Sequence, residues 1–328
     1  MTTAPFEGRN VLITGGLGFI GSNLALRLVE LGAEITLLDS LIPEYGGNSF
    51  NIAGIQDRVH VNISDVRDVH SMRYLVQDRD YMFNLAGQTS HLDSMEDPYT
   101  DLEINCRAQL SILEACRKYN PGIKVVFAST RQIYGKPDSL PVKEDHLLRP
   151  VDVNGINKMA GEWYHIVYNN VFGIATCALR LTNTYGPRMR VKDARQTFLG
   201  MWIRLLLEGK PFEVWDGRQL RDFTYVDDVV EALLQAATSE HAYGKTFNLG
   251  GDDVISLKDL AGLLLEIHGG GEYTMAAYPA ERKRIDIGDY YADYGSIQSA
   301  LGWKPRVSLR EGLARTLTYY REHLPHYV

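Results

Sequence analysis

The sequence predicts an α/β protein with a doubly wound parallel sheet and a smaller C-terminal α/β lobe. Short apolar runs rich in β-branched residues alternate with segments of helical periodicity through the first 180 residues, and strands separated by helices form parallel sheets. This alternation changes after Pro187. A chain of 328 residues that is 45% hydrophobic is also long enough to bury one large core and a second, smaller one.

The first half of the chain predicts six strands and three helices. Residues 10–14 (NVLIT) form an apolar run that ends in glycines, and leucines then recur at helical spacing over residues 22–31. Further strands are predicted at 34–38, 59–63, 80–85, 124–129 and 173–180, and further helices at 99–119 and 154–170. We therefore expect residues 1–186 to form the first domain.

The second half predicts fewer strands in a different order. Helices are expected at 196–208, 226–238, 256–267 and 308–323, and a strand at 245–249. We assign residues 187–222 and 251–328 to the smaller lobe and expect residues of about 223–250 to complete the first domain. No internal repeat or low-complexity segment interrupts the chain.

The overall charge argues against nucleic acid and against an anionic membrane surface as partners. The formal net charge is -7 and the sequence pI is about 5.7, whereas both partners require a clustered basic face. The first ten residues lack the pattern of an export signal, and no run of about 18 apolar residues occurs. Cys106, Cys116 and Cys177 form no CxxC pair, so we expect no metal site and a cytoplasmic location.

A glycine-rich turn joins the first predicted strand to the first predicted helix. Gly15, Gly18 and Gly21 lie at spacing GxxGxxG, which lets the backbone approach a pyrophosphate at the amino end of the helix. Asp39 ends the second strand 18 residues after Gly21, where its carboxylate can accept hydrogen bonds from ribose hydroxyls and repel a 2′-phosphate. This combination predicts a Rossmann-like domain that binds NAD rather than NADP. The further predicted cofactor contacts are the neighbouring residues Phe19, Ile20 and Ser40.

Six motifs follow one another along the chain in a specific order. They are TGGLGFIG in the glycine turn, NLAG at 84–87, Ser129-Thr130 before IYG, LTNTYGP at 181–187, RDFTYVDDV at 221–229 and LGWKP at 301–305. Together they resemble the NAD-dependent epimerase/dehydratase family, whose members modify nucleotide sugars. The resemblance implies a cofactor domain followed by a substrate lobe. It also implies that Asp65 meets the adenine and that Val66, Leu85, Ala86 and Gly87 line the cofactor.

One position departs from the family pattern. Members carry a tyrosine and a lysine at spacing YxxxK, which places both side chains on one face of a helix. Lys158 matches the lysine, but Asn154 stands where the tyrosine is expected. By resemblance, Lys158 orients the cofactor and Thr130 hydrogen-bonds the reacting hydroxyl. The family tyrosine acts as acid and base, and an amide has no proton to exchange, so the proton must be handled differently here.

Three explanations for Asn154 remain open at the level of the sequence. His91 or Asp93, which follow NLAG on a loop expected to face the sugar, could replace the tyrosine, although His91 could equally be a loop histidine satisfied by the backbone. Thr130 and Lys158 could instead relay a proton through water held by Asn154. Finally, the protein could bind NAD and a nucleotide sugar without turnover.

Residues 131 and 132 favour one reaction of the family. Similar dehydratases carry an Asp-Glu pair directly after the threonine, and UDP-glucuronate decarboxylases carry a glutamate two positions beyond it; here the residues are Arg131 and Gln132. Epimerisation through a transient keto sugar needs neither carboxylate, so the resemblance favours a UDP-sugar 4-epimerase-like enzyme. The alternative is a dehydratase or decarboxylase with a relocated base. We expect Arg131 either to contact the substrate, for example a uronate carboxylate, or to pair with a surface carboxylate.

The nucleoside diphosphate and its base require cationic, backbone and aromatic contacts. By resemblance, the residues that supply them are Asn183, Arg195, Trp215, Arg221 and Arg284. Arg195 and Arg284 could also be solvated charges, and Trp215 an ordinary core residue. UDP is the favoured nucleotide, with dTDP, GDP and CDP left open. The helices near 99–119 and 154–170 correspond to those that pair in relatives as a four-helix interface, so a homodimer is expected.

Overall fold

A seven-stranded parallel sheet forms the centre of the larger domain. The computed structural model describes residues 5–328, so the first four residues of the expected first domain lie outside the described part. The strands lie in the order β10-β6-β5-β4-β1-β2-β3, and every neighbouring pair is parallel. Their bounds are β1 Asn10–Thr14, β2 Glu34–Asp39, β3 Val59–Ile63, β4 Tyr81–Asn84, β5 Lys124–Thr130, β6 Thr176–Leu181 and β10 Thr246–Asn248. The predicted fold class is confirmed.

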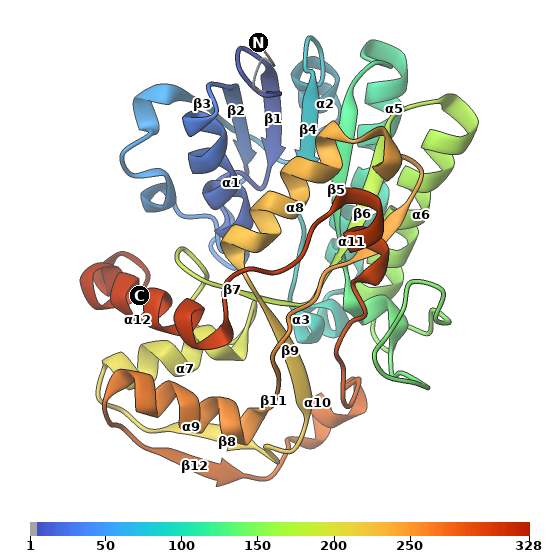
Figure 1. Ribbon diagram of the computed structural model, residues 1–328. Coiled ribbons are helices and arrows are strands. Elements are labelled where there is room, and N and C mark those ends of the chain that lie inside the picture. The colour runs from blue at the N-terminus through green and yellow to red at the C-terminus, as the bar shows by residue number, and fades with distance from the viewer. Residues whose placement is uncertain (1–4) are drawn as a thin grey trace.

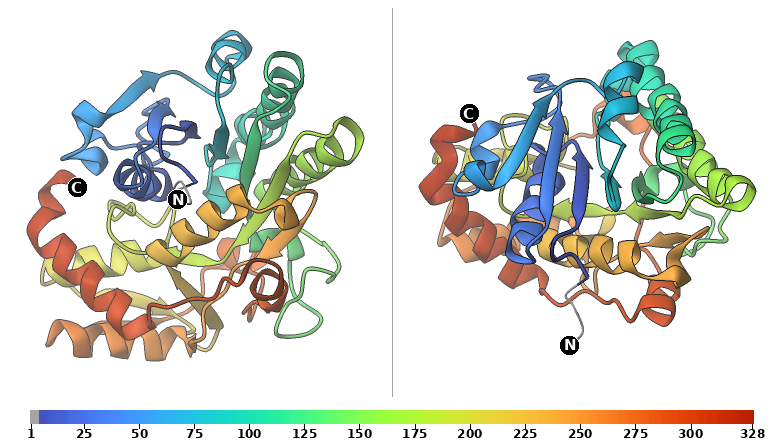
Figure 2. Two further views of the ribbon diagram at one scale, coloured as in Figure 1. Left: turned by 45° about the horizontal axis from the view of Figure 1, so that its top comes forward. Right: turned by 90° about the horizontal axis from the view of Figure 1, so that it is seen from above.

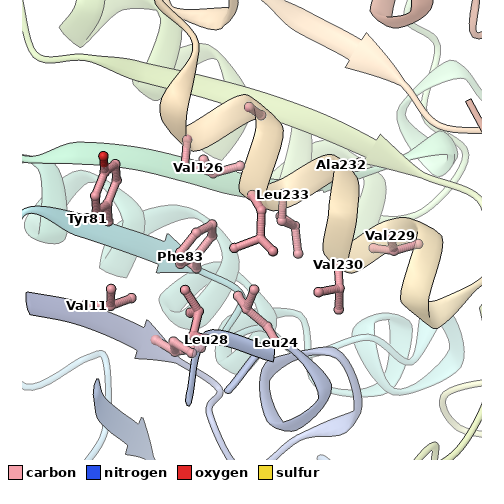
Figure 3. Close-up of a cluster of buried hydrophobic side chains, with 14 of the residues drawn as sticks. Val11, Leu24, Leu28, Tyr81, Phe83, Val126, Val229, Val230, Ala232 and Leu233 are labelled. Carbon is pink, nitrogen blue, oxygen red and sulfur yellow. The ribbon is translucent and has the colours of Figure 1, made fainter. Parts of the chain in front are cut away.

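Helices cover both faces of this sheet (Figures 1 and 2). One face carries α1 (Phe19–Glu30) and α8 (Val226–Thr238), and the other carries α2 (Val69–Leu75), α5 (Ala108–Tyr119) and α6 (Val153–Phe172). Successive side chains of a strand point to opposite faces, so Val11 of β1 packs toward α1 whereas Leu12 packs toward α5. Figure 3 shows where α1 and α8 meet over the strands, through Leu24, Leu28, Val229, Val230 and Leu233.

A smaller lobe lies next to the carboxyl ends of the parallel strands, below them in Figure 1. It contains a three-stranded sheet of order β11-β9-β7 and a two-stranded sheet of β12 and β8. The strands are β7 Asn183–Tyr185, β8 Phe212–Trp215, β9 Leu220–Tyr225, β11 Val254–Ser256 and β12 Tyr273–Ala276. The helices are α7 Phe198–Leu207, α9 Leu257–His268, α10 Ala280–Arg284 and α12 Leu309–His323. Trp202, Phe212 and Leu264 belong to its separate core.

The remaining helical segments are short. They are α3 His91–Glu96, α4 Pro98–Leu102, a π turn at Glu103–Arg107, α11 Gly295–Leu301 and 3₁₀ turns at Ser49–Ile52, Gln56–Arg58, Arg131–Tyr134, Glu240–Ala242 and Leu324–His326. The π turn interrupts the helix predicted at 99–119, and such turns often mark functional sites. No helix within residues 5–328 has the length and apolar composition needed to cross a membrane.

Two element boundaries differ from the sequence prediction for reasons of capping. α1 begins at Phe19, before the leucine repeat, because Gly18 of the glycine turn is its N-cap. β6 begins at Thr176 rather than at residue 173, because Gly173 ends α6 in the left-handed conformation with φ 71°. The five strands of the smaller lobe were not predicted individually, since they are only three to six residues long and show little alternation.

The segment around α11 belongs to a different core from the one expected. The sequence assigns residues 251–328 to the smaller lobe, yet Ile297 and Trp303 pack in the core of the larger domain. The Trp303 indole nitrogen donates a hydrogen bond to the Asp228 carbonyl on α8 at 2.9 Å. A large aromatic side chain needs an apolar surface to pack against when it is buried. For Trp303 this surface belongs to the larger domain.

A buried ion pair fixes α6 against the sheet. Glu162 on α6 and Arg180 on β6 approach to 2.6 Å, with side chains 1% and 4% exposed. Glu162 also accepts a hydrogen bond from the Ser129 hydroxyl on β5 at 2.6 Å. Burial alone would lower the pKa of Arg180, but the hydrogen bonds and charge of Glu162 together with Tyr134 raise it. The pair therefore holds α6 in a fixed position beside the carboxyl end of β5.

Candidate active site

A cavity of about 620 Å³ lies between the carboxyl ends of the parallel strands and the smaller lobe. Open α/β sheets bind their ligands at this edge, and the volume lies within the range of about 300–1,000 Å³ for small-molecule sites. Both domains contribute to the lining. It includes every residue that the sequence predicted for cofactor, substrate and catalysis except Arg284.

The glycine turn forms one end of the cavity. Gly15 has a φ of +68°, and a Cβ there would lie 3.0 Å from the backbone nitrogen of Ala86. Gly21 passes too close to the Gly15 carbonyl to carry any Cβ. Gly18 caps the amino end of α1, whose free N–H groups and positive potential suit a pyrophosphate. The residues present therefore fit a dinucleotide.

Two carboxylates border the same end of the cavity. Asp39, at the end of β2, is buried and accepts backbone hydrogen bonds from Leu17 at 3.0 Å and Leu41 at 2.9 Å. Burial raises the pKa of Asp39, and these donors oppose the rise. Asp65 follows β3 and pairs with Arg67 at 2.7 Å. Burial alone would raise the pKa of Asp65, but the hydrogen bonds from Arg67 lower it.

Asn154 belongs to a buried network of amides. Its Nδ2 donates to the Gln88 carbonyl at 2.8 Å and to Asp101 at 3.0 Å. Asp101 is fully buried and also accepts from Asn105 at 3.0 Å and Asn157 at 2.8 Å. Since an amide nitrogen has two hydrogens, both donors of Asn154 are used inside the protein. Only its carbonyl oxygen is left to meet a ligand or a water molecule.

Lys158 lies one turn further along α6 and borders the cavity. Its ammonium donates to the Ala128 carbonyl at 3.2 Å and lies 5.0 Å from the centre of the Phe127 ring. Burial lowers the pKa of Lys158 to about 8, although the charge of Asp101 opposes this. A Cβ at Gly87 would come within 2.9 Å of the ammonium nitrogen. The glycine of NLAG therefore leaves the space that the lysine occupies.

His91, at the start of α3, faces a buried carboxylate. Its Nδ1 lies 2.9 Å from Asp152 Oδ2, although the N–H direction is poorly aligned with that oxygen. Asp152 caps α6 by accepting from the Gly155 backbone at 2.7 Å, and it also accepts from the Gln132 amide at 2.7 Å. Burial alone would raise the pKa of Asp152, but His91 and these donors lower it. The His91 side chain is 38% exposed and lines the cavity, so its Nε2 remains available to a ligand.

The first turn after β5 carries two predicted residues. Thr130 lines the cavity and accepts a hydrogen bond from the Gln132 backbone at 3.2 Å. Arg131 lines the cavity beside it. Asn183 at the start of β7 donates to the Asp222 carbonyl at 3.0 Å. The turn after β5 and the first strand of the smaller lobe therefore both contribute to the lining.

Arginines gather at the end of the cavity formed by the smaller lobe. Arg221 donates to the Gly288 carbonyl and lies 3.3 Å from Asp286. The Arg282 guanidinium lies 4.9 Å from the centre of the Trp215 ring. Both arginines and Trp215 line the cavity. Arg284 does not: α10 turns it outward, where it is exposed, and Arg282 two residues earlier faces the cavity instead.

An ion pair beside the cavity joins the larger domain to the smaller lobe. Arg195, in the loop before α7, lies 3.4 Å from Asp93 on α3. Both side chains are partly exposed, at 42% and 30%, so the pair is weak in water. Asp93 is thus occupied by a cation, whereas the neighbouring His91 has a free ring nitrogen.

Three residues of the site gave no usable signal in the sequence. Asp101 lies inside an amphipathic helical segment, where an acidic residue ordinarily faces solvent. Asp152 could have been suspected only as a helix N-cap, since it precedes the helix that carries Asn154. Arg282 stands among three basic residues of one short helix, and only the direction of that helix selects it.

Comparison with known proteins places the chain among nucleotide-sugar enzymes. The model of the NAD dependent epimerase/dehydratase family matches residues 11–250. A relative from Methanocaldococcus jannaschii is 34% identical over 95% of this chain and 99% of its own. A UDP-glucose 4-epimerase from Thermotoga maritima, solved with UDP-glucose, is 30% identical with a TM-score of 0.87, covering 96% of this chain and 99% of that one. DesIV, a dTDP-glucose 4,6-dehydratase from Streptomyces venezuelae solved with NAD and TYD, is 27% identical with a TM-score of 0.88, covering 96% and 98%.

The buried Lys158 ammonium predicts a specific dependence of stability on pH. Because the folded-state pKa is about 8 and the ordinary value is 10.5, the folded protein binds fewer protons than the unfolded chain between these pH values. Its stability therefore rises with pH across that window. Replacing Lys158→Met should raise the free energy of unfolding at pH 7 by up to about 3 kcal/mol, and the gain should vanish as pH approaches 10.5.

Urea denaturation of both proteins from pH 7 to pH 10.5 measures this difference. Lys304→Met is the matched control, because Lys304 is exposed and its removal should leave the pH dependence unchanged. A Lys158→Met protein that is less stable than the parent at pH 7 would contradict the burial cost.

Proposed function

Because the chain belongs to the NAD dependent epimerase/dehydratase family, we propose that it is a nucleotide-sugar epimerase that inverts one sugar carbon through a transient keto sugar. Its cofactor is NAD. We favour epimerisation because the turn after β5 presents Arg131 and Gln132 and no carboxylate. Gln132 is hydrogen-bonded to Asp152, and Asp152 does not line the cavity. β-Elimination needs an additional base that removes a proton from a sugar carbon, whereas inversion through a keto sugar needs only one group that takes and returns the hydroxyl proton.

The residues around the glycine turn would hold NAD. Gly15, Gly18 and the amino end of α1 suit its pyrophosphate, and Asp39 suits the adenosine ribose. Asp65, Val66 and Leu85 to Gly87 border the remaining path along the strand ends. When bound, NAD supplies reversible hydride transfer, which interconverts a sugar alcohol and its ketone. Lys158, beside Gly87, is placed to orient the cofactor next to the sugar.

His91 is our proposed acid and base in place of the family tyrosine. Its Nδ1 faces Asp152, which favours the tautomer that leaves Nε2 free to take the proton of the reacting hydroxyl. The buried Asp152 carboxylate would also stabilise the imidazolium that results. Asn154 cannot exchange a proton, and its donors are already used. Asp93 is paired with Arg195, so His91 has the better geometry of the two residues that the sequence suggested.

The nucleotide is proposed to be UDP, bound between the arginines and Trp215 of the smaller lobe. Arg221 and Asn183 suit the diphosphate, Arg195 borders the same region, and Arg282 and Trp215 suit the base. UDP is also the nucleotide named for the Thermotoga maritima relative.

The three cysteines are free thiols, which suits a reducing compartment, and we propose the cytoplasm as the location.

The reaction is tested by incubating the protein with NAD and a panel of nucleotide sugars in deuterated water, followed by NMR. We expect one sugar to be converted to its epimer, with no solvent deuterium at the inverted carbon. Deuterium in the product together with loss of water would instead identify a dehydratase. Thermal stabilisation by a nucleotide sugar with no product from any member of the panel would favour a protein that binds without turnover.

Removal of His91 is expected to reduce turnover and to change its pH dependence. General acid–base help contributes about 10²- to 10⁴-fold, so His91→Ala should lower kcat by such a factor with KM little changed, and the acidic limb of the pH–rate profile should disappear. Asp152→Asn should weaken the same limb. His268→Ala is the control, because His268 is partly exposed and does not line the cavity. An unchanged profile in both His91→Ala and Asp93→Asn would eliminate this loop as the source of the acid and base.

An exposed apolar face on α5 and α6 supports the proposed homodimer. Ile156, Trp163, Val167 and Val171 are 44–66% exposed and recur at spacings of seven, four and four, which places them on one face of α6. Leu110 and Tyr119 of α5 are also exposed, and the two helices are neighbours. We propose that this face, the α5–α6 face, pairs with its copy in a second chain as a four-helix contact.

A charge in this face should prevent dimerisation. Val167→Glu would bury carboxylates against an apolar surface, so the variant is expected to be monomeric by size-exclusion chromatography with light scattering, whereas the parent protein is dimeric. Val254→Glu, at a similarly exposed position on β11, should remain dimeric. A parent protein that is monomeric at tens of micromolar would overturn the proposed dimer.

A further inference from the structure

Arg131 has no direct partner inside the protein. Its Nε is buried without a hydrogen-bond acceptor, and within residues 5–328 no carboxylate lies at ion-pair distance from its guanidinium. The two arginines that are buried within residues 5–328 are both paired: Arg180 with Glu162 at 2.6 Å and Arg221 with Asp286 at 3.3 Å. An enclosed cation without a partner is costly, so its presence points to a partner that arrives with a ligand.

The charged groups around Arg131 do not cancel its charge at close range. Burial lowers the pKa of Arg131 to about 10, the neighbouring Arg221 lowers it as well, and Asp222, Tyr290 and Asp286 oppose the change. With this pKa the side chain is still a cation at neutral pH. Asp286 is engaged by Arg221, and Asp222 attracts Arg131 only from beyond ion-pair distance.

The accessible part of Arg131 faces the cavity. Its guanidinium lies 5.7 Å from the centre of the buried Tyr290 ring, and neither Tyr290 nor Asp222 lines the cavity. These groups and the buried Nε therefore occupy the inner side of Arg131. The terminal nitrogens, which are not enclosed as Nε is, remain on the cavity side. Two parallel N–H groups at the end of a planar guanidinium match the two oxygens of a carboxylate.

The position of Arg131 in the chain places it at the sugar rather than at the nucleotide. It directly follows Thr130, the proposed contact of the reacting hydroxyl, on the larger domain. The nucleotide end, with Arg282 and Trp215, is formed by the smaller lobe. We propose that Arg131 is a subsite for a carboxylate on the sugar ring, so that the preferred substrate is a nucleotide-linked uronic acid rather than a neutral hexose.

A phosphate of the nucleoside diphosphate is a second anion that an arginine can bind, and Arg221, the proposed diphosphate contact, lies close to Arg131. The two sources are distinguished by ligands that differ in one group. UDP contains both phosphates and no hexose, UDP-glucose adds a neutral hexose, and UDP-glucuronate replaces its hydroxymethyl group by a carboxylate. The inference rests on the proposed nucleotide-sugar substrate, but its test measures binding and not turnover.

The test is isothermal titration of the NAD-loaded protein with these three ligands. Hydrogen bonds to a charged group contribute about 1.5–3 kcal/mol, or roughly 10- to 100-fold in affinity. The parent protein should therefore bind UDP-glucuronate about 10- to 100-fold more tightly than UDP-glucose. Arg131→Gln should remove this preference and leave the affinity for UDP within about threefold. Arg131→Lys should retain part of the preference, because a charge without the planar fork remains.

Arg282→Gln is the matched control at the nucleotide end. It removes another cavity-lining guanidinium and should weaken all three ligands by a similar factor, so that the preference for the carboxylate persists. Two results would overturn the subsite: equal affinities for the two sugars in the parent protein, or an Arg131→Gln variant that loses UDP affinity as strongly as it loses UDP-glucuronate affinity. The latter would assign Arg131 to the diphosphate.

The outcomes separate this subsite from the proposed reaction. A protein that prefers UDP-glucuronate through Arg131 but converts no nucleotide sugar would keep the subsite and lose the epimerase. A protein that epimerises UDP-glucose with no preference for the carboxylate would keep the epimerase and lose the subsite.

Discussion

Helix α6 is held to the sheet by an ion pair from which water is excluded, and the geometry of the site depends on where that helix lies. Glu162 and Arg180 join α6 to β6, and the Ser129 hydroxyl adds β5 to the same contact. Removing one partner of such a pair leaves a buried, uncompensated charge, so the helix has little freedom to shift. Because the helix is fixed, its first two turns present Asp152, Asn154 and Lys158 beside the end of β5 in one arrangement.

Asn154, which stands where the family resemblance leads us to expect a tyrosine, limits what this part of the helix can do. A phenol at this position would direct an exchangeable proton at the ligand, whereas the amide turns its donors inward to Asp101 and the Gln88 carbonyl. The buried Asp101 carboxylate is satisfied by three amides, and its negative charge partly offsets the cost of burying the Lys158 ammonium. Asn154 therefore stabilises the buried Asp101 carboxylate by donating a hydrogen bond to it. In the proposed reaction the acid and base come from another residue, and we propose the pair of His91 and Asp152 for this role.

The two ends of the cavity offer different groups to a ligand. The larger domain contributes backbone donors and the carboxylates Asp39 and Asp65 around the glycine turn, and the smaller lobe contributes guanidinium groups, one of them beside Asp286. This arrangement suits a ligand pair in which ribose hydroxyls lie at one end and a diphosphate at the other. The partnerless Arg131 stands between these regions on the larger domain. A site that handled only a neutral sugar would have no need of a cation there.

Local pattern alone predicted the parallel sheet and the glycine turn with Asp39, because each depends on residues close together in the chain. The resemblance to the family indicated that Asn154 stands where a tyrosine is expected next to Lys158. All but one of the site residues predicted from the motifs line the cavity. Only the tertiary structure paired Asn154 with Asp101 and His91 with Asp152, since more than fifty residues separate the members of each pair. It also turned Arg282 rather than Arg284 into the cavity and left Arg131 without a partner. Pairing and burial of a charge are set by how distant elements pack, and no spacing within the sequence records them.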